Sequence, residues 1–377
     1  MPAMRVGVLG AGPIGLGVAA LALLNEAEVG LWSRRDSTRL SAYQEIGRIL
    51  SKNRAAAGEP GEILARLRLC ADVAEAVRGV DWAVESVVET LDVKYAVLRA
   101  VQDATPPSAF LATTASWIPI SIIARPLTRP ERFVGLHFYN PPWRRAAVEI
   151  IPGERSASET MAAAETLVRG LGRVPAVLRR DFPGFVGNRL LLRQYEEAVL
   201  VVADGGTPEA VDAAYRLRLG FPFGPCESMD YIGLELTHRL FDETGRWGRW
   251  EGSWRTLAYL DERLRRAERG AAAGRGFYVY AQHRWERQPR DRDSEVAGEV
   301  ADLVAPVVLE GARLAREGVA TAEVVETIAR DCIGWPEGPL AIGRRLGRAP
   351  LGDALARRYE HDPAERYRDD GSLSDVL

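Results

Sequence analysis

A glycine-rich turn near the start of the chain constrains the fold more than any other feature of the sequence. An apolar run at 5–9 leads into the turn, and an uninterrupted apolar stretch at 14–24 follows it. A strand, a G-x-G-x-x-G turn and a buried helix in this order bind dinucleotides, because the glycines allow a tight turn, close approach of the pyrophosphate and close helix packing. We therefore predict a dinucleotide-binding turn. Its residues are Gly10, Ala11, Gly12, Pro13, Ile14 and Gly15.

The N-terminal part of the chain alternates short apolar runs with helical stretches. The further apolar runs lie at 28–32, 82–88, 109–113, 133–137 and 148–151, and a polar helical stretch covers 38–57. Short apolar runs separated by helices are typical of a parallel sheet that is covered on both faces. We expect residues 1–182 to form an α/β Rossmann domain with a mainly parallel sheet.

Two segments in the helical C-terminal part of the chain resemble each other. The first runs from Asn188 to the sequence GFPFGP at 220–225, and the second runs from Asp302 to GWPEGP at 334–339. The shared pattern predicts an internal duplication of an all-α domain, the second copy being degenerate. The alternative is two generic helical hairpins. The predicted domains are 183–285 and 286–377, with a polar linker at 282–293.

The charge balance and the cysteines argue against several classes of protein. The formal net charge is −3, so we expect no basic surface for nucleic acid or for an anionic membrane. The N-terminus has no charged region followed by a cleavage site, so we expect a cytoplasmic protein. Cys70, Cys226 and Cys332 are far apart in the sequence and lack metal-ligand spacing. We expect buried thiols and no metal site.

The residues after the second apolar run bear on the choice of nicotinamide cofactor. An acid at the end of this strand binds the ribose 2′-hydroxyl of NAD, whereas arginine accommodates the 2′-phosphate of NADP. Ser33 occupies the place of the acid, and Arg34 and Arg35 follow it. Two guanidinium groups attract a phosphate, so the sequence favours NADP(H) over NAD(H). In the alternative, Asp36 acts as the acid and both arginines are solvated.

His137 and Glu149 form a candidate acid–base pair. His137 ends the apolar run at 133–137, where a parallel strand would direct it toward the cofactor crevice. Glu149 lies inside the apolar run at 148–151, and a buried acid needs a partner. An adjacent histidine would supply one, and the carboxylate would then fix the imidazole tautomer. From these residues alone, a histidine with a structural role is the alternative.

Five motifs occur along the chain in a fixed order. They are the glycine turn, ESVVE at 85–89 with DVK at 92–94, RPERF at 129–133 with HFYNP at 137–141, DFPGFVGNRL at 181–190, and GP at 224–225 with DYIGL at 230–234. In these motifs and their order the chain resembles the 3-hydroxyacyl-CoA dehydrogenase family over nearly its whole length. The segment GRGFYVY at 274–280 is similar to a marker of that family near the end of its first C-terminal domain.

The resemblance implies a role for each matching residue. His137 matches the general base that removes the proton of the 3-hydroxyl group, and Glu149 matches the carboxylate that orients it. Ser116 and Asn188 match the residues that hold the substrate oxygen and carbonyl. Three further residues match positions around the nicotinamide ribose and the substrate pocket, and we count them with the cofactor site. They are Glu89, Lys94 and Asn140.

The expected reaction is the interconversion of a (3S)-3-hydroxyacyl thioester of CoA and its 3-oxoacyl form. The loop at 113–117 departs from the family pattern, because Thr114 replaces the usual asparagine and the bulky Trp117 follows Ser116. A dehydrogenase of another hydroxy acid therefore stays open, either bound to a carrier protein or free, as carnitine and gulonate are. A non-catalytic dinucleotide-binding sensor or scaffold is the alternative of a different class.

The duplication also bears on the oligomeric state. In shorter members of the family, two chains pair through the C-terminal helical domain. A second copy in the same chain would meet the first at a high effective concentration and take the partner's place. We therefore expect a monomer with internally paired copies, with a homodimer through another surface as the alternative.

Overall fold

A computed structural model describes residues 3–53, 59–247, 252, 254–280 and 299–376 of the chain. The chain divides into two compact units, and the boundary between them follows Phe182. The first unit also includes the short segment 331–333, and the second holds the rest of the C-terminal part. The linker predicted at 282–293 lies outside the described residues.

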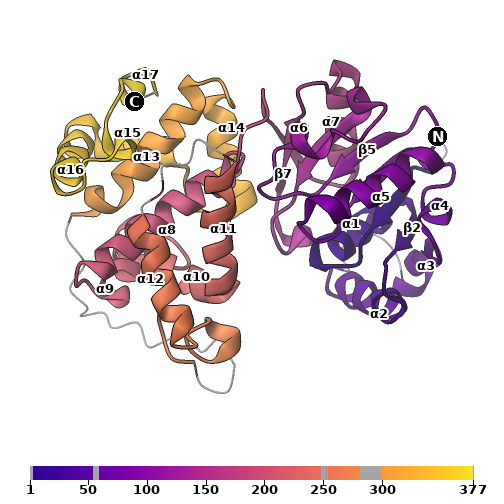
Figure 1. Ribbon diagram of the computed structural model, residues 1–377, viewed down its shortest axis with the longest axis horizontal. Helices are drawn as coiled ribbons and strands as arrows, with labels where there is room; N and C mark the ends of the chain where they lie inside the picture. The colour runs from indigo at the N-terminus through magenta and orange to yellow at the C-terminus, as the bar shows by residue number, and fades with distance from the viewer. Residues whose placement is uncertain (1–2, 54–58, 248–251, 253, 281–298, 377) are drawn as a thin grey trace. The chain divides into compact units, whose positions relative to one another are not determined.

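The first unit contains an eight-stranded sheet in the order β3-β2-β1-β4-β5-β6-β7-β8. The described residues up to 182 are drawn from indigo to magenta in Figure 1. All neighbouring strands are parallel except β6 and β7. The connection at 138–146 is too short for the crossover that a parallel pair needs, so these two strands are antiparallel. The prediction of a mainly parallel sheet is confirmed. The strands are β1 (Arg5–Leu9), β2 (Glu28–Trp32), β3 (Leu67–Cys70), β4 (Trp82–Glu85), β5 (Phe110–Thr113), β6 (Phe133–His137), β7 (Ala147–Pro152) and β8 (Val174–Val177).

Helices cover both faces of this sheet. Val6 and Val8 of β1 join one apolar core with residues of α1, α2, α3 and α7. Side chains alternate along a strand, so Gly7 lies on the other face, where a Cβ atom would come within 2.8 Å of the carbonyl oxygen of Ala76 in α4. Helices α5 and α6 lie beside α4 on this second face. The elements are α1 (Pro13–Leu24), α2 (Asp36–Lys52), α3 (Pro60–Leu64), α4 (Val73–Ala76), α5 (Leu91–Ala104), α6 (Ile120–Ile123), η1 (Pro130–Arg132), η2 (Pro142–Arg144) and α7 (Ser158–Gly170).

The apolar runs of the sequence located most of these strands but not all of them. The runs at 5–9, 28–32 and 133–137 coincide with β1, β2 and β6, while β4 ends at Glu85, before the run at 82–88 does. The sequence analysis did not identify β3 or β8. Both are edge strands with partly exposed residues, so neither is a continuous apolar run.

The second unit is helical and repeats one order of elements. Each segment begins with a long helix, followed by a short helix, a π-helix and a further pair of helices. The first segment has α8 (Gly187–Ala203), α9 (Pro208–Ala213), η3 (Ala214–Arg218), α10 (Pro225–Ile232), α11 (Leu234–Arg246), α12 (Trp254–Arg265) and η4 (Ala271–Ala273). The second has α13 (Val300–Arg316), α14 (Ala322–Thr327), η6 (Ile328–Ile333), α15 (Pro339–Leu346), α16 (Arg348–His361), η7 (Glu365–Tyr367) and α17 (Ser372–Val376). Among the described residues, no helix has the length and hydrophobicity needed to cross a membrane.

The two segments build the same turn before the Gly-Pro helix. Asp212 accepts a hydrogen bond from the backbone N–H of Cys226 in α10 at 2.9 Å. In the second segment, Glu326 accepts one from Leu340 in α15 at 2.8 Å. A Cβ atom on the glycine before each proline would come within 2.2 Å of Asp212 or 2.3 Å of Glu326, so only glycine fits there. Each residue of the second turn lies 114 positions after its counterpart.

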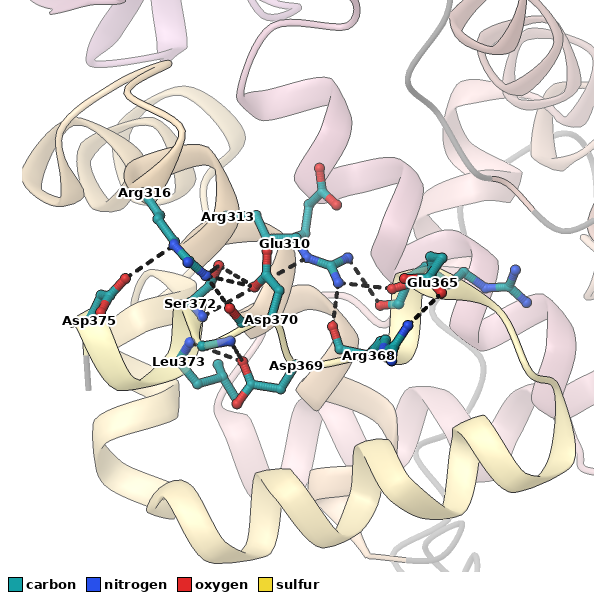
Figure 2. Close-up of polar contacts among 12 residues, drawn as sticks. Glu310, Arg313, Arg316, Glu365, Arg368, Asp369, Asp370, Ser372, Leu373 and Asp375 are labelled. Carbon is teal, nitrogen blue, oxygen red and sulfur yellow. Dashed lines mark hydrogen bonds and ion pairs between the residues drawn. The ribbon is translucent and has the colours of Figure 1, made fainter.

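The last residues of the chain are fastened to α13 by arginines (Figure 2). Arg313 donates to the backbone carbonyl of Glu365 at 2.8 Å. Arg316 forms ion pairs with Asp370 and Asp375, both at 3.3 Å. These contacts tie the residues from η7 to α17 onto the long helix of the second helical segment.

Candidate active site

The glycine turn leaves room for a ligand at the start of α1. Gly10 has a φ of +127°, and a Cβ atom there would lie 2.2 Å from the carbonyl oxygen of Ser86. A Cβ atom on Gly15 would lie 2.0 Å from the carbonyl oxygen of Gly10, so packing requires both glycines. At Gly12, however, a Cβ atom would meet no described protein atom within 4 Å. Since Gly12 is exposed and caps α1 without a side chain, this opening fits a pyrophosphate on the helix N-terminus.

The end of β2 lies beside this turn. The backbone N–H of Gly10 donates to the carbonyl oxygen of Trp32 at 2.8 Å. Ser33 follows directly and is partly buried, while Arg34 and Arg35 are exposed before α2 begins. The residues predicted to meet the adenosine ribose are therefore next to the glycine turn.

His137 and Glu149 are cross-strand neighbours on β6 and β7. They are paired in the antiparallel register, and both side chains project from the sheet face opposite the α1 core. His137 Nδ1 lies 2.5 Å from Glu149 Oε2, and both side chains are almost fully buried. The structure thus brings together the two residues of the predicted acid–base pair.

A buried charge cluster lies at the ends of β4 and β5 on the same sheet face. Glu85 is the last residue of β4, and its carboxylate accepts from the Nζ of Lys94 at 3.0 and 3.1 Å. The hydroxyl of Thr113 at the end of β5 donates to Glu85 at 2.6 Å. Burial opposes the charge of Lys94, but the carboxylates of Glu85 and Glu89 outweigh it and raise the pKa of Lys94. Lys94 is fully buried and charged, so it fastens this part of the unit together.

Glu89 connects this cluster to the loop after β5. Its Oε2 lies 3.4 Å from the ammonium group of Lys94. Its Oε1 accepts from the backbone N–H of Ser116 at 2.8 Å and from that of Trp117 at 3.4 Å. Glu89, Lys94 and Ser116 therefore belong to one connected network in the first unit. Their predicted contacts with cofactor and substrate stay predictions.

The two candidate asparagines lie on different units. Asn140 is exposed in the turn after β6, and a cis peptide bond joins it to Pro141. Asn188 is the second residue of α8 in the second unit and is buried. It is thus placed at the start of the first long helix.

Sequence reasoning missed three residues that hold the predicted ones in place. Glu85 accepts from Lys94, Thr113 donates to Glu85, and the hydroxyl of Tyr139 donates to Glu149 at 2.9 Å. Glu85 has the same signal that identified Glu149, an acid in an apolar strand. Tyr139 has a weaker one, since it lies two residues after a strand-end histidine and so shares its side of the chain.

Two family models and a curated relative match the chain. The model described as 3-hydroxyacyl-CoA dehydrogenase, NAD binding domain, matches residues 5–182. The model for the C-terminal domain of 3-hydroxyacyl-CoA dehydrogenase matches residues 184–280 and 300–376. A probable 3-hydroxybutyryl-CoA dehydrogenase of Deinococcus radiodurans is 30% identical over 282 residues, which are 74% of this chain and 100% of that protein. The chain belongs to the 3-hydroxyacyl-CoA dehydrogenase family.

Solved structures agree with membership of the 3-hydroxyacyl-CoA dehydrogenase family. A 3-hydroxybutyryl-CoA dehydrogenase of Escherichia coli K12 has a TM-score of 0.87 and covers 100% of this chain and 98% of that one. At 23% identity this likeness shows the shared fold. An (S)-3-hydroxybutyryl-CoA dehydrogenase of Ralstonia eutropha is 27% identical, with a TM-score of 0.68 over 74% of this chain and 100% of that one. The predicted family, its enzymatic nature and its use of a nicotinamide cofactor are confirmed.

Proposed function

We propose that this member of the 3-hydroxyacyl-CoA dehydrogenase family interconverts a short (3S)-3-hydroxyacyl-CoA and its 3-oxoacyl-CoA. The observation that carries the proposal is the buried His137–Glu149 pair, 2.5 Å apart, on the sheet of a nucleotide-binding unit. A carboxylate on one ring nitrogen fixes the tautomer, so the other nitrogen accepts or returns a proton. The named activities of the matched relatives, which act on 3-hydroxybutyryl-CoA, support a short acyl group.

The residues of the chain divide the proton chemistry among them. His137 Nε2 takes the proton of the 3-hydroxyl group in the oxidative direction and returns it in the reductive direction. Glu149 stabilises the imidazolium that forms, because an ion pair in a buried site is weakly screened. A bound nicotinamide supplies the acceptor or donor of the hydride at C3. We assign Ser116 and Asn188 to hold the substrate oxygen and carbonyl as hydrogen-bond donors.

The charge cluster positions the substrate loop in this proposal. Lys94 neutralises Glu89, and Glu89 accepts from two backbone N–H groups of the loop that carries Ser116. We assign Glu89, Lys94 and Asn140 to the surroundings of the nicotinamide ribose. The buried ammonium of Lys94 acts there through Glu89, since its own contacts are the carboxylates of Glu85 and Glu89.

We also propose that the enzyme prefers NADP(H) to NAD(H). Arg34 and Arg35 are exposed beside the glycine turn, and Ser33 leaves the place of the ribose-binding acid without a carboxylate. Asp36, the alternative acid, is held by an ion pair with Arg39 at 3.0 Å at the start of α2. Two arginines and no free acid favour a 2′-phosphate.

The two helical segments support a duplication with internal pairing. They share the order of their elements and the capped turn, the same family domain matches both, and α8 packs on α13 within one unit. We propose that the second copy takes the place of a partner subunit's helical domain. Light scattering should then report a monomer, and a dimer joined through α8 would contradict the proposal.

An absorbance assay with acetoacetyl-CoA tests the reaction and the cofactor together. We expect oxidation of the reduced nicotinamide, faster with NADPH than with NADH at equal concentration. Ser33→Asp should reverse the preference, because a carboxylate repels the 2′-phosphate and binds the 2′-hydroxyl. No oxidation with either cofactor would overturn the CoA-thioester substrate, and an unchanged preference in Ser33→Asp would overturn the cofactor assignment.

A further inference from the structure

The carboxylate of Glu149 receives two hydrogen bonds at one oxygen atom. Glu149 Oε2 lies 2.5 Å from His137 Nδ1 and accepts from the hydroxyl of Tyr139 at 2.9 Å. The rings of His137 and Tyr139 also contact each other, with centroids 4.5 Å apart and planes at 54°. The histidine, the glutamate and the tyrosine thus form a closed triangle of contacts.

We propose that Tyr139 is a positioning residue that fixes Glu149 and limits how strongly this carboxylate holds the proton-bearing form of His137. The proposal rests on the proposed function of the His137–Glu149 pair. It adds a third residue to that pair, and this residue acts through the carboxylate without touching the reacting atoms.

The shared oxygen explains why Tyr139 acts on His137. A hydrogen bond donated to a carboxylate stabilises its negative charge, so the same oxygen attracts a second donor less strongly. The imidazolium form of His137 therefore gains less from Glu149 than it would from a carboxylate bound to histidine alone. As a result, the imidazolium form of His137 gives up its proton more readily, as the general acid of the reductive direction must.

Tyr139 serves only as a donor in this arrangement. Burial, together with the neighbouring Glu149 carboxylate, raises the pKa of Tyr139 well above its usual value. The hydroxyl therefore keeps its proton throughout the working range of a histidine. It cannot compete with His137 as a base.

Three other charged or titratable residues act on Tyr139 or on its neighbour Cys332, and none of them is altered by removing the Tyr139 hydroxyl. Arg145 acts on Tyr139 as a positive charge, and Cys332 of the segment 331–333 also faces it. Burial raises the pKa of the Cys332 thiol well above its usual range, so it stays neutral, and Asp331 acts on that thiol as a negative charge. A variant that loses only the Tyr139 hydroxyl leaves all three in place.

Tyr139→Phe tests the proposal, with Tyr95→Phe as the matched control. Phenylalanine keeps the ring that contacts His137 and removes the hydroxyl. Tyr95 likewise donates one hydrogen bond at 2.8 Å, but to the backbone carbonyl oxygen of Ile122. The control therefore loses a comparable bond in the same unit without any contact to Glu149. The titration of His137 is followed by NMR in both variants, with its signal assigned by comparison with His137→Gln.

We expect the pKa of His137 to rise by roughly 0.5 to 1 unit in Tyr139→Phe and to stay unchanged in Tyr95→Phe. Turnover in the reductive direction with acetoacetyl-CoA should fall by about 3- to 10-fold, the range of one hydrogen bond, with KM little changed, because the imidazolium becomes a weaker acid. An unshifted His137 titration in Tyr139→Phe would overturn the proposal. The NMR result needs no substrate, so inactivity of the unmodified protein on acetoacetyl-CoA would count against the proposed function alone.

Discussion

The two helical segments have the same order of elements but differ at the position of the predicted substrate-binding asparagine. Helices α8 and α13 both have 17 residues and begin the two segments, with each position of α13 lying 113 residues after its counterpart. At the second position, the first copy has Asn188 and the second has Ala301. The capped turn before the Gly-Pro helix is the same in both. The two segments therefore share their packing arrangement, whereas the predicted site asparagine occurs in the first segment alone among these two positions.

At one pair of equivalent positions, the two segments have glutamates whose pKa values shift in opposite directions. Glu197 of α8 and Glu310 of α13 correspond to each other, and both are buried. Burial works to raise the pKa of Glu310, but Arg189 and Arg193 outweigh it, and the pKa is lowered. Burial raises the pKa of Glu197 to about 7, against the opposing charge of Arg358 at 3.5 Å.

This contrast shows that the contacts between the two helical segments are not symmetric. Arg189 and Arg193 reach from α8 to Glu310 on α13, so one carboxylate holds the two long helices together. Neither oxygen of Glu197 has a hydrogen-bond partner among the described residues. The same residue type at equivalent positions thus has a lowered pKa and links two helices in the second segment, whereas in the first segment its pKa is raised to about 7.

The largest effect is expected from Glu310→Gln. This change removes the carboxylate that pairs with the buried guanidinium groups of Arg189 and Arg193, while Arg193 keeps its ion pair with Glu196. Removing one partner of a buried ion pair costs about 3 to 5 kcal/mol of the free energy of unfolding. Denaturant unfolding of the helical unit measures it, with the exposed Glu360→Gln as the control. A loss no greater than that of the control would show that this link does not hold the copies together.

Asn188→Ala places in α8 the residue type that α13 has at the equivalent position, Ala301. If Asn188 donates to the substrate, turnover should fall by about 100- to 1,000-fold, as when a donor to a developing oxyanion is lost. The reciprocal change, Ala301→Asn, should leave turnover unchanged because we predict a site residue in the first segment and not at this position of the second. Steady-state rates of both variants measure the difference. Equal losses in the two variants would contradict the assignment of the substrate-binding role to the first segment.

Glu197→Gln should change how stability depends on pH. A carboxyl whose pKa is raised on folding stabilises the folded protein below its unfolded pKa and loses this contribution as pH rises through its folded pKa, here about 7. The unmodified protein should therefore lose up to about 3 kcal/mol of stability as the pH rises from 4.5, the usual pKa of this carboxyl group, to its folded pKa of about 7. The variant should lack that loss. Unfolding curves measured across this pH range test this, and parallel pH profiles for the two proteins would contradict it.

The sequence predicted the parts of the molecule that have strong local signals. The glycine turn, the β6 strand and the pair of His137 and Glu149 follow from apolar periodicity and from the rule that a buried acid needs a partner. The antiparallel pairing that makes His137 and Glu149 neighbours depends on connection length and tertiary packing. Tyr139 escaped prediction because the target of a tyrosine hydroxyl is fixed by the pairing of two strands.

In the helical unit, too, the sequence predicted the elements but not the contacts that depend on tertiary packing. The repeated Gly-Pro pattern predicted two similar segments, and the structure shows the same order of elements in both. The opposite states of Glu197 and Glu310 depend on arginines that are distant in the sequence or on another helix. Spacing within one segment carries no information about such contacts.

The turnover of His137→Gln with acetoacetyl-CoA tests the central claim most directly. Glutamine keeps a polar side chain of similar size but cannot exchange the proton, so we predict a fall of about 10²- to 10⁴-fold. Binding of the reduced cofactor, measured by its fluorescence, should stay unchanged because the glycine turn is intact. Turnover close to that of the unmodified protein would contradict the assignment of His137 as the acid–base residue.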